Sequence, residues 1–367
     1  MVNLLTCYPI CRHHYPFMHS LATEHLIRLA FDAAQLATIQ RLGEARGRQD
    51  LFIAQIPEQL EVLRQAAVVE SSESSNRIEG VVAAPGRVEA IVLRAAAPRD
   101  RSEQEIAGYR DALQLIHESH EHMGFTTNVV LQLHSMLFRY LPSEGGTWKA
   151  TDNEIVERDA QGRVTRVRFT PVPAVGTPGA MLALTSAYTA AQREGRFDPL
   201  ILVPLTVLDF LCIHPFRDGN GRMARLLSLL LLYHSRYRVG RYISLERVVE
   251  ESKETYYEAL ERSSQGWHEG RHDTRPWLDY VWGVLLRAYR EFEERVGVLS
   301  MGRGSKTERV REAVARRQGL FSISDIEADC PGVSRDMVRV VLRQLRDEGA
   351  ITPQGKGRGA RWVHRQA

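Results

Sequence analysis

The sequence has few cysteines and no long apolar run. Its four cysteines, Cys7, Cys11, Cys212 and Cys330, are too few and too scattered for the disulfide framework of a small secreted domain. No run of about 18 apolar residues is present, so no membrane span is expected. The N-terminus also lacks the compact apolar segment of a secretory signal. We therefore expect a globular, cytoplasmic protein in a reducing environment, without a membrane partner.

The first twenty residues have little regular pattern. Cys7, Cys11, His13 and His14 are potential metal ligands, but no second pair follows at a spacing typical of zinc sites. We interpret residues 1–20 as a disordered tail. The other 347 residues have an ordinary globular composition, and the full length of 367 allows two or three domains.

A polar segment, residues 214–225, lies between two apolar runs, 205–213 and 226–232. Buried polar groups are costly, so such a cluster requires a reason. Its His214 is a candidate general base near neutral pH, and Asp218 is a hard oxygen ligand suited to Mg²⁺. A Gly-Asn-Gly turn ahead of a predicted helix can direct backbone N–H groups at an anion, and arginines suit phosphate oxygens. The segment therefore favours nucleotide chemistry.

Two other phosphate-binding patterns are excluded. Residues 219–224 fit the loose dinucleotide pattern G-x-G-x-x-A, but they do not follow a strand directly, as that fold requires. The pattern G-x-x-x-x-G-K-[ST] is absent from the sequence. A lone histidine beside an apolar run is usually structural, yet no core needs so many polar groups so close together.

The segment resembles the motif of the Fic (filamentation-induced-by-cyclic-AMP) family, H-x-F-x-[DE]-G-N-G-R-x-x-R, at every defined position. The resemblance implies transfer of AMP from ATP to a Ser, Thr or Tyr hydroxyl of a protein, the chain itself included. It implies that His214 deprotonates that hydroxyl. It also implies that Phe216 belongs to the nucleotide-binding site, where it anchors the loop. It also implies that Asp218 binds Mg²⁺ between the α- and β-phosphates.

The same resemblance assigns the rest of the motif to the nucleotide. Gly219, Asn220 and Gly221 are implied to form an anion hole. Arg222 is implied to hold the β- and γ-phosphates, and Arg225 the γ-phosphate. Positioning and electrostatic stabilisation supply most of the catalysis of phosphoryl transfer, so this set of groups suits the reaction.

A second, shorter pattern precedes the motif, in residues 71–80. Its Ser75 and Glu79 are four residues apart, so they share a face if this stretch is helical, and Gly80 suits the end of a helix. The stretch resembles the Fic inhibitory motif, [ST]-x-x-x-E-[GN]. The resemblance implies that Glu79 pairs with Arg225 and blocks productive binding of the γ-phosphate. A Ser-rich stretch of this kind is otherwise an ordinary helix cap.

The remaining pattern predicts a mainly α fold. Apolar residues recur at helical spacing from about residue 22, and again over 102–141. We interpret His134, in the second stretch, as a core histidine with satisfied hydrogen bonds or as a packing residue. Turn residues 161–162 between β-branched runs predict a short hairpin. In the Fic family this hairpin, the flap, pairs with the main chain of the target; an ordinary surface hairpin is the alternative.

The C-terminal part differs from the rest in charge. Residues 301–367 carry 14 Lys+Arg and 8 Asp+Glu, whereas the first 300 residues carry 34 and 37. A capping box over 322–325, a turn at 331–333, a helix from 334 and a hairpin over 351–363 resemble a winged helix-turn-helix. Such domains bind DNA or serve for protein contacts and dimerisation, so DNA and a second copy of the chain both remain as partners of residues 305–367.

The expected architecture is thus a Fic-type helical bundle with a hairpin flap. We predict a tail at 1–20, an N-terminal helical domain at 21–100, a catalytic domain at 101–298 and a winged helix-turn-helix at 305–367. The predicted function is an autoinhibited protein adenylyltransferase that uses ATP and Mg²⁺. Two alternatives remain open, removal of AMP from a modified protein and DNA-binding regulation through the C-terminal domain.

Overall fold

The computed structural model describes residues 20–55, 57–84, 86–94, 96–159, 161–300, 305–317, 319–355 and 360–365. The predicted tail therefore lies outside the described residues except for Ser20, and so do the predicted linker residues 301–304. The chain forms two compact units, residues 1–292 and 293–367. The helices of the predicted N-terminal domain lie in the same unit as the motif at 214–225.

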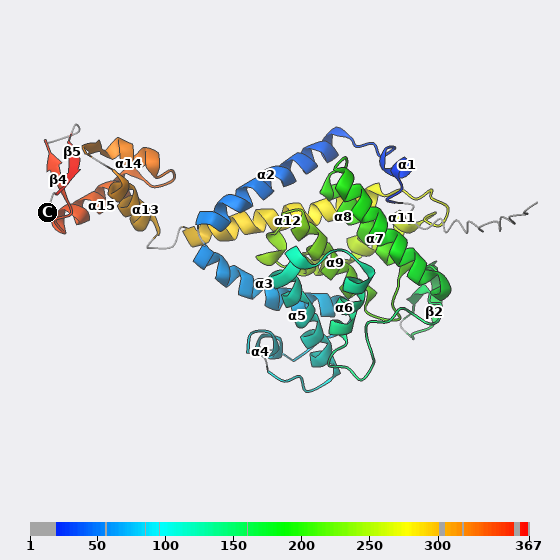
Figure 1. Cartoon of the computed structure of the whole chain (residues 1–367). Helices are drawn as coiled ribbons and strands as arrows, with labels where there is room; N and C mark the ends of the chain where they lie inside the picture. The colour runs from blue at the N-terminus through cyan, green and yellow to red at the C-terminus, as the bar shows by residue number, and fades with distance from the viewer. Residues whose placement is uncertain are drawn as a thin grey trace, which may run out of the picture. The chain divides into compact units, whose positions relative to one another are not determined.

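The described residues are mostly helical, which confirms the predicted mainly α class (Figure 1). Unit 1 begins with a short helix and a break at 27–32, where the sequence pattern predicts continuous helix. Its α-helices are α1 (Thr23–Leu26), α2 (Ala33–Gln55), α3 (Pro57–Ile78), α4 (Arg87–Arg94), α5 (Arg101–Ser119), α6 (Thr127–Leu137), α7 (Thr177–Glu194), α8 (Pro199–Ile213), α9 (Asn220–His234), α10 (Leu245–Glu251), α11 (Lys253–Ser264) and α12 (Arg275–Ser300), the last of which continues into unit 2.

Helices α8 and α9 form the centre of the unit 1 core, and the polar segment joins them. Asp198 caps α8 by accepting the backbone N–H of Leu200 at 2.8 Å. The helix continues through Pro204, a residue type that bends or ends many helices. Proline cannot donate to the carbonyl of Leu200, and the indole N–H of Trp282 donates to that oxygen instead, at 2.7 Å. A side chain from α12 thus satisfies the group that the proline leaves unpaired.

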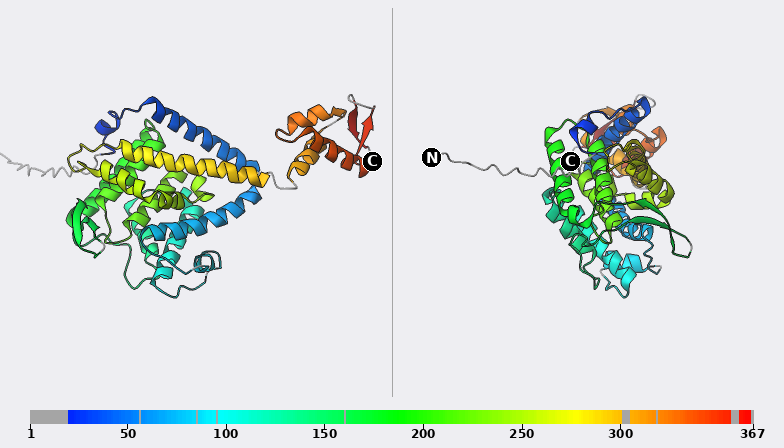
Figure 2. Two further views of the ribbon diagram at one scale, coloured as in Figure 1. Left: turned by 180° about the vertical axis from the view of Figure 1, so that it is seen from behind. Right: turned by 90° about the vertical axis from the view of Figure 1, so that its right-hand side faces the viewer.

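Two long helices, α2 and α12, run side by side along unit 1 (Figures 1 and 2). Gln35 of α2 donates to Asp279 of α12 at 2.8 Å. Further along, the phenol of Tyr289 donates to Gln49 at 3.1 Å. These contacts attach the N-terminal helices to the unit that holds the motif.

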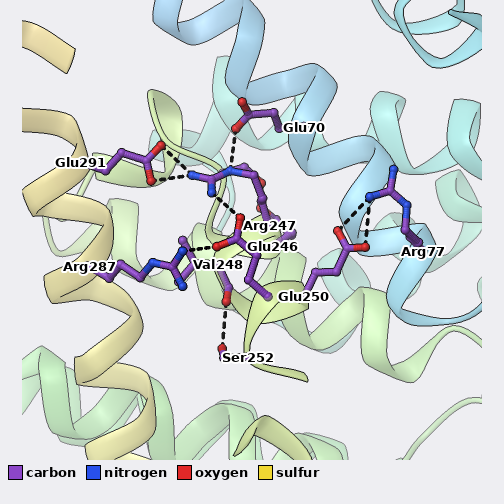
Figure 3. Close-up of polar contacts among 11 residues, drawn as sticks. Glu70, Arg77, Glu246, Arg247, Val248, Glu250, Ser252, Arg287 and Glu291 are labelled. Carbon is purple, nitrogen blue, oxygen red and sulfur yellow. Dashed lines mark hydrogen bonds and ion pairs between the residues drawn. The ribbon is translucent and has the colours of Figure 1, made fainter. Parts of the chain in front are cut away.

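Ion pairs fasten α3, the helix of the predicted inhibitory motif, to its neighbours (Figure 3). Arg247 of α10 is the centre of this network. Its guanidinium contacts Glu70 of α3 at 3.1 Å and Glu291 of α12 at 2.5 Å. Nearer the end of α3, Arg77 contacts Glu250 of α10 at 3.1 Å. One cation thus connects α3, α10 and α12, which fixes the position of α3 in the unit.

The predicted hairpin is present as strands β1 (Ile155–Arg158) and β2 (Val164–Phe169). They pair antiparallel, with Val156 opposite Val167 and Glu157 opposite Arg166. Arg166 and Arg168 of β2 each lie 2.5 Å from the carboxylate of Glu261 in α11. Two ion pairs therefore connect the hairpin to α11.

Unit 2 contains the predicted order of helices followed by a hairpin. Its elements after α12 are α13 (Ser305–Arg316), β3 (Phe321–Ser322), α14 (Ile323–Asp329), α15 (Arg335–Asp347), β4 (Ile351–Gln354) and β5 (Arg361–His364). The predicted capping box is formed by Ser322 and Asp325, and Ser334 caps α15. The sequence pattern missed β3, which pairs with β5 in the sheet order β3-β5-β4.

Candidate active site

The polar segment forms a tight loop between α8 and α9. His214 ends α8 in the left-handed conformation, at φ 50° and ψ 61°, and its N–H donates to Phe210. Asn220 closes the loop, because its side-chain oxygen accepts the N–H of Phe216 at 2.9 Å and its amide donates to the carbonyl of Phe216 at 2.8 Å. The ring of Phe216 is fully buried. Asn220 thus holds the loop through both backbone groups of Phe216, while the buried ring packs in the core.

Lys149, which sequence reasoning did not single out, braces the same loop. Its ammonium donates to Asn153 at 2.8 Å and to the carbonyl of Ile213, the last residue of α8, at 3.2 Å. A cation is favourable at a helix C-terminus, where carbonyl oxygens lack helical partners. Burial nevertheless lowers the pKa of Lys149 to about 8. The only sequence signal for this residue was its place before the predicted hairpin.

The imidazole of His214 is neutral at physiological pH. Burial, followed by the charge of Lys149, lowers the pKa of His214 to about 4. Its Nδ1 atom has no hydrogen-bond partner among the described residues. A neutral imidazole can accept a proton, and an anion bound beside it would raise its pKa and strengthen it as a base.

Arg225 is buried and bound to the end of α3. Its Nη2 lies 2.8 Å from Oε1 of Glu79, and its Nε donates to the hydroxyl of Ser75 at 2.9 Å. Burial opposes the charge of the guanidinium, but the Glu79 carboxylate holds the pKa of Arg225 above its usual value. Helix α3 ends at Ile78, so Glu79 lies in the turn that follows, where Gly80 has φ 85°. The two predicted inhibitory residues thus meet the last arginine of the motif.

The carboxylate of Glu79 occupies an anion cradle at the start of α9. A Cβ built on Gly221 would lie only 2.2 Å from its Oε1 atom, so the carboxylate approaches the backbone where a side chain would stand. The N-terminus of a helix and an arginine both favour negative charge. The protein's own carboxylate therefore shows that this place accepts an anionic oxygen.

Arg222 contacts a different set of groups. Its Nη1 lies 2.6 Å from Glu105 of α5 and 3.4 Å from the side-chain oxygen of Asn76 in α3, and the residue is 2% exposed. Its Nη2 lies 3.6 Å from Asp218, whose carboxylate also accepts the N–H of Gly219 at 2.6 Å. The two motif arginines therefore point to different partners, and Glu105 is a site residue that the sequence did not reveal.

A cleft of about 140 Å³ opens beside the loop. Tyr256 and Tyr257 of α11 contribute an aromatic wall. Arg222 is not among its lining residues. The residues that line the cleft are Glu79, Ile155, Arg168, Phe169, Leu211, Cys212, His214, Gly221, Arg225, Tyr256, Tyr257, Leu260, Glu261 and Ser264. The cleft thus joins the candidate base, the anion cradle and the hairpin.

Comparisons with known proteins agree with this arrangement. The family model of the Fic/DOC family matches residues 124–232. A Fido domain-containing protein of Dictyostelium discoideum is 38% identical over 53 residues, which make up 14% of this chain and 37% of that protein. The match therefore spans little more than a third of that relative.

Solved structures of Fic proteins share the fold. A Fic family protein from Desulfovibrio desulfuricans matches with TM-score 0.60 and 20% identity, over 92% of this chain and 98% of that one. A Fic domain containing signaling protein from Bacteroides thetaiotaomicron matches with TM-score 0.57 and 20% identity, over 71% and 98%. Fic-1 from C. elegans matches with TM-score 0.54 and 21% identity, over 72% of each chain. At these identities the likeness concerns the fold alone. Together with the matched family model, it shows that the chain contains a Fic/DOC domain at residues 124–232.

Proposed function

We propose that the protein is an autoinhibited adenylyltransferase that moves AMP from ATP to a protein hydroxyl. Fic domain proteins are in general transferases, and the finer assignment depends on the site. The observation that carries it is the Glu79 carboxylate, which lies on Arg225 and Gly221 in a cradle suited to phosphate oxygens. The candidate base, His214, lines the same cleft.

In this proposal His214 takes the proton of the target hydroxyl. The hydroxyl oxygen then bonds to the α-phosphorus, and the bond from that phosphorus to the β-phosphate oxygen breaks, so that pyrophosphate leaves. The backbone N–H groups of Gly219–Gly221 and the guanidinium of Arg225 would stabilise the negative charge that develops on the phosphates. The position of Glu79 explains inhibition, because its carboxylate repels a phosphate and already occupies the arginine.

Asp218 is the proposed ligand of Mg²⁺. No group of three or more His, Cys, Asp or Glu in the described residues could by itself hold a metal ion. Mg²⁺ commonly binds one or two carboxylates together with phosphate oxygens and water, so a single aspartate beside the cradle fits that mode. Bound there, the cation would offset charge on the α- and β-phosphates. The assignment of Arg222 to the β- and γ-phosphates stays a prediction, and its pair with Glu105 supports a role in holding the loop.

The β1–β2 hairpin is the proposed docking strand for the target. A two-stranded sheet leaves an unpaired edge on each strand, which can accept a further strand through its main chain. Ile155 and Phe169, a pair at the base of this hairpin, line the cleft. A segment paired there would therefore carry its hydroxyl close to His214.

Label transfer from α-labelled ATP with Mg²⁺ tests the proposal. Wild type, Glu79→Gly and Glu79→Gly/His214→Ala would each be incubated alone and with a cell lysate. We expect label with Glu79→Gly and a loss of about 10²-fold or more in the double variant, because a positioned base contributes that much. Absence of label from all three, with folded protein that binds ATP, would contradict AMP transfer. Release of AMP from a pre-modified target by the same protein would then support AMP removal.

A second candidate function, DNA binding, is favoured by the exposed face of α15. Arg339 and Arg343 lie one helical turn apart and are both exposed, and Arg343 has no ion pair among the described residues. Arg335 extends the same row toward the start of the helix. A basic helix after a helix-turn is the element that enters a groove of DNA in many regulators. The full chain should shift a random DNA duplex at low salt, and Arg339→Gln/Arg343→Gln should reduce the salt dependence; equal shifts for both proteins would argue against this surface.

A further inference from the structure

We propose that His134, on α6, is a positioning residue that sets the orientation of the Asp218–Gly219 peptide, and with it the anion hole. This inference rests on the proposed function of the loop. His134 lies 80 residues before His214 in the sequence and is 5% exposed. Its ring stacks on the anchoring Phe216, with 3.6 Å between ring centroids and an interplanar angle of 1°.

The two ring nitrogens of His134 connect two separate loops. The backbone N–H of Gly146 donates to Nδ1 at 2.8 Å, and Nε2 lies 3.1 Å from the carbonyl oxygen of Asp218. A carbonyl oxygen can only accept, so the hydrogen is on Nε2 and Nδ1 keeps its lone pair. The partners therefore require one neutral tautomer. Burial, which lowers the pKa of His134 to about 4, is consistent with that form.

Planarity of the peptide bond transmits the position of the Asp218 carbonyl to the next amide. In a trans peptide the C=O and the following N–H point in opposite directions within one plane. A donor that fixes the carbonyl of Asp218 therefore aims the N–H of Gly219 away from His134. That N–H donates to the Asp218 carboxylate at 2.6 Å. The same hydrogen bond thus governs both a proposed anion-hole donor and the proposed metal ligand.

The surroundings of His134 leave this peptide little freedom. Gly219 has φ 82°, and a Cβ built on it would lie 3.2 Å from the ring of Phe138 and 3.5 Å from Nε2 of His134. On the other side, Gly146 has φ 83°, and a Cβ on Gly145 would lie 2.6 Å from the backbone oxygen of His134. Both loops therefore approach the imidazole at glycine positions, where their backbones can come close.

Packing alone does not account for these contacts of His134, because a phenylalanine would stack equally well without making either hydrogen bond. Two polar variants separate the bonds. The amide nitrogen of glutamine falls at the place of Nε2 and can donate to Asp218, whereas the amide oxygen of asparagine falls at the place of Nδ1 and can accept from Gly146. Each variant loses the ring and keeps one bond, so each is the control of the other.

Label transfer in the Glu79→Gly background would test the proposal. We expect His134→Asn to lower kcat by about tenfold to a hundredfold, since small displacements of catalytic groups have effects of that size. His134→Gln should stay within about fivefold of its parent, with the KM for ATP changed little in either variant because Arg225 and the aromatic wall are retained. Equal losses of kcat in the two variants, or losses confined to KM, would overturn the positioning role.

Amide hydrogen exchange over residues 214–222 supplies a readout that needs no activity. His134→Asn should speed exchange in this segment relative to His134→Gln, while the melting temperatures of the two proteins stay similar. Equal exchange in the two variants would refute the inference even if Glu79→Gly transferred no label. Failure of the proposed function, which is absence of label in the parent, is therefore distinguishable from failure of this inference.

Discussion

Arginines in the two units of the chain are used in opposite ways. In unit 1, Arg222 and Arg225 are almost fully buried, and each meets a carboxylate that is more than a hundred residues away in sequence. In unit 2, Arg335, Arg339 and Arg346 are exposed, and their carboxylate partners lie within eight residues. Buried charges need matched partners, whereas exposed charges are solvated and remain available to an outside partner. Burial therefore makes the first set part of the folded site, whereas the second set stays in contact with solvent.

The largest effect is expected from breaking the buried pair of Arg222. Glu105→Gln keeps the size of the side chain but removes the close, buried counter-charge of the guanidinium and leaves only the exposed carboxylate of Asp218, 3.6 Å away. The free energy of unfolding should fall by about 3–5 kcal/mol. Urea unfolding followed by tryptophan fluorescence would measure this, since Trp148, Trp267, Trp277 and Trp282 lie in unit 1.

The control for that experiment removes both charges. Glu105→Leu/Arg222→Met replaces the ion pair with apolar side chains and should be less destabilised than Glu105→Gln, because no uncompensated charge remains. A double variant as unstable as the single one would show that the pair contributes through shape and not through charge.

A smaller effect is expected from Lys149, the buried cation at the end of α8. Its pKa of about 8 in the folded protein lies below the ordinary value of 10.5, so between these pH values the unfolded chain binds a proton that the folded chain has released. This lysine should therefore make the protein more stable as pH rises through that window, by on the order of 2 kcal/mol. The free energy of unfolding of wild type minus that of Lys149→Met should grow over the same window. A difference that stays constant with pH would contradict this prediction.

The smallest effect is expected from the exposed pairs of unit 2. Asp336→Asn removes the partner of Arg339 on α15, where the two side chains are 87% and 43% exposed. The free energy of unfolding should change by about 0.5 kcal/mol or less, because solvent screens exposed ion pairs. Calorimetry of the full chain would detect a larger change. Such a change would show that the pair of Arg339 and Asp336 stabilises the fold, which would argue against a recognition role for Arg339.

Among the described helices, none combines the length and apolarity needed to cross a bilayer.

Some helix starts, such as those at Ser322 and Ser334, could be predicted from the sequence because caps act locally. Asp198, Ser244, Ser322 and Ser334 each accept a backbone N–H two or three residues ahead, so their effect is visible from adjacent residues. The apolar pattern runs through residues 27–32, where the helix breaks. Local sequence also could not show that a tryptophan from a distant helix donates to the carbonyl that Pro204 leaves unpaired.

The sequence by itself determined the chemistry of the loop at 214–225 and the pairing of two short motifs. The residue types and spacings within each segment can be read before any fold is known, and the pairing of Glu79 with Arg225 is what their resemblance to two Fic motifs implies. Only the tertiary structure decided the partners of the loop, since Glu105 and His134 reach it across 117 and 84 residues respectively. Neither belongs to a local pattern, because a buried charge or carbonyl is satisfied by whichever helix packs against it.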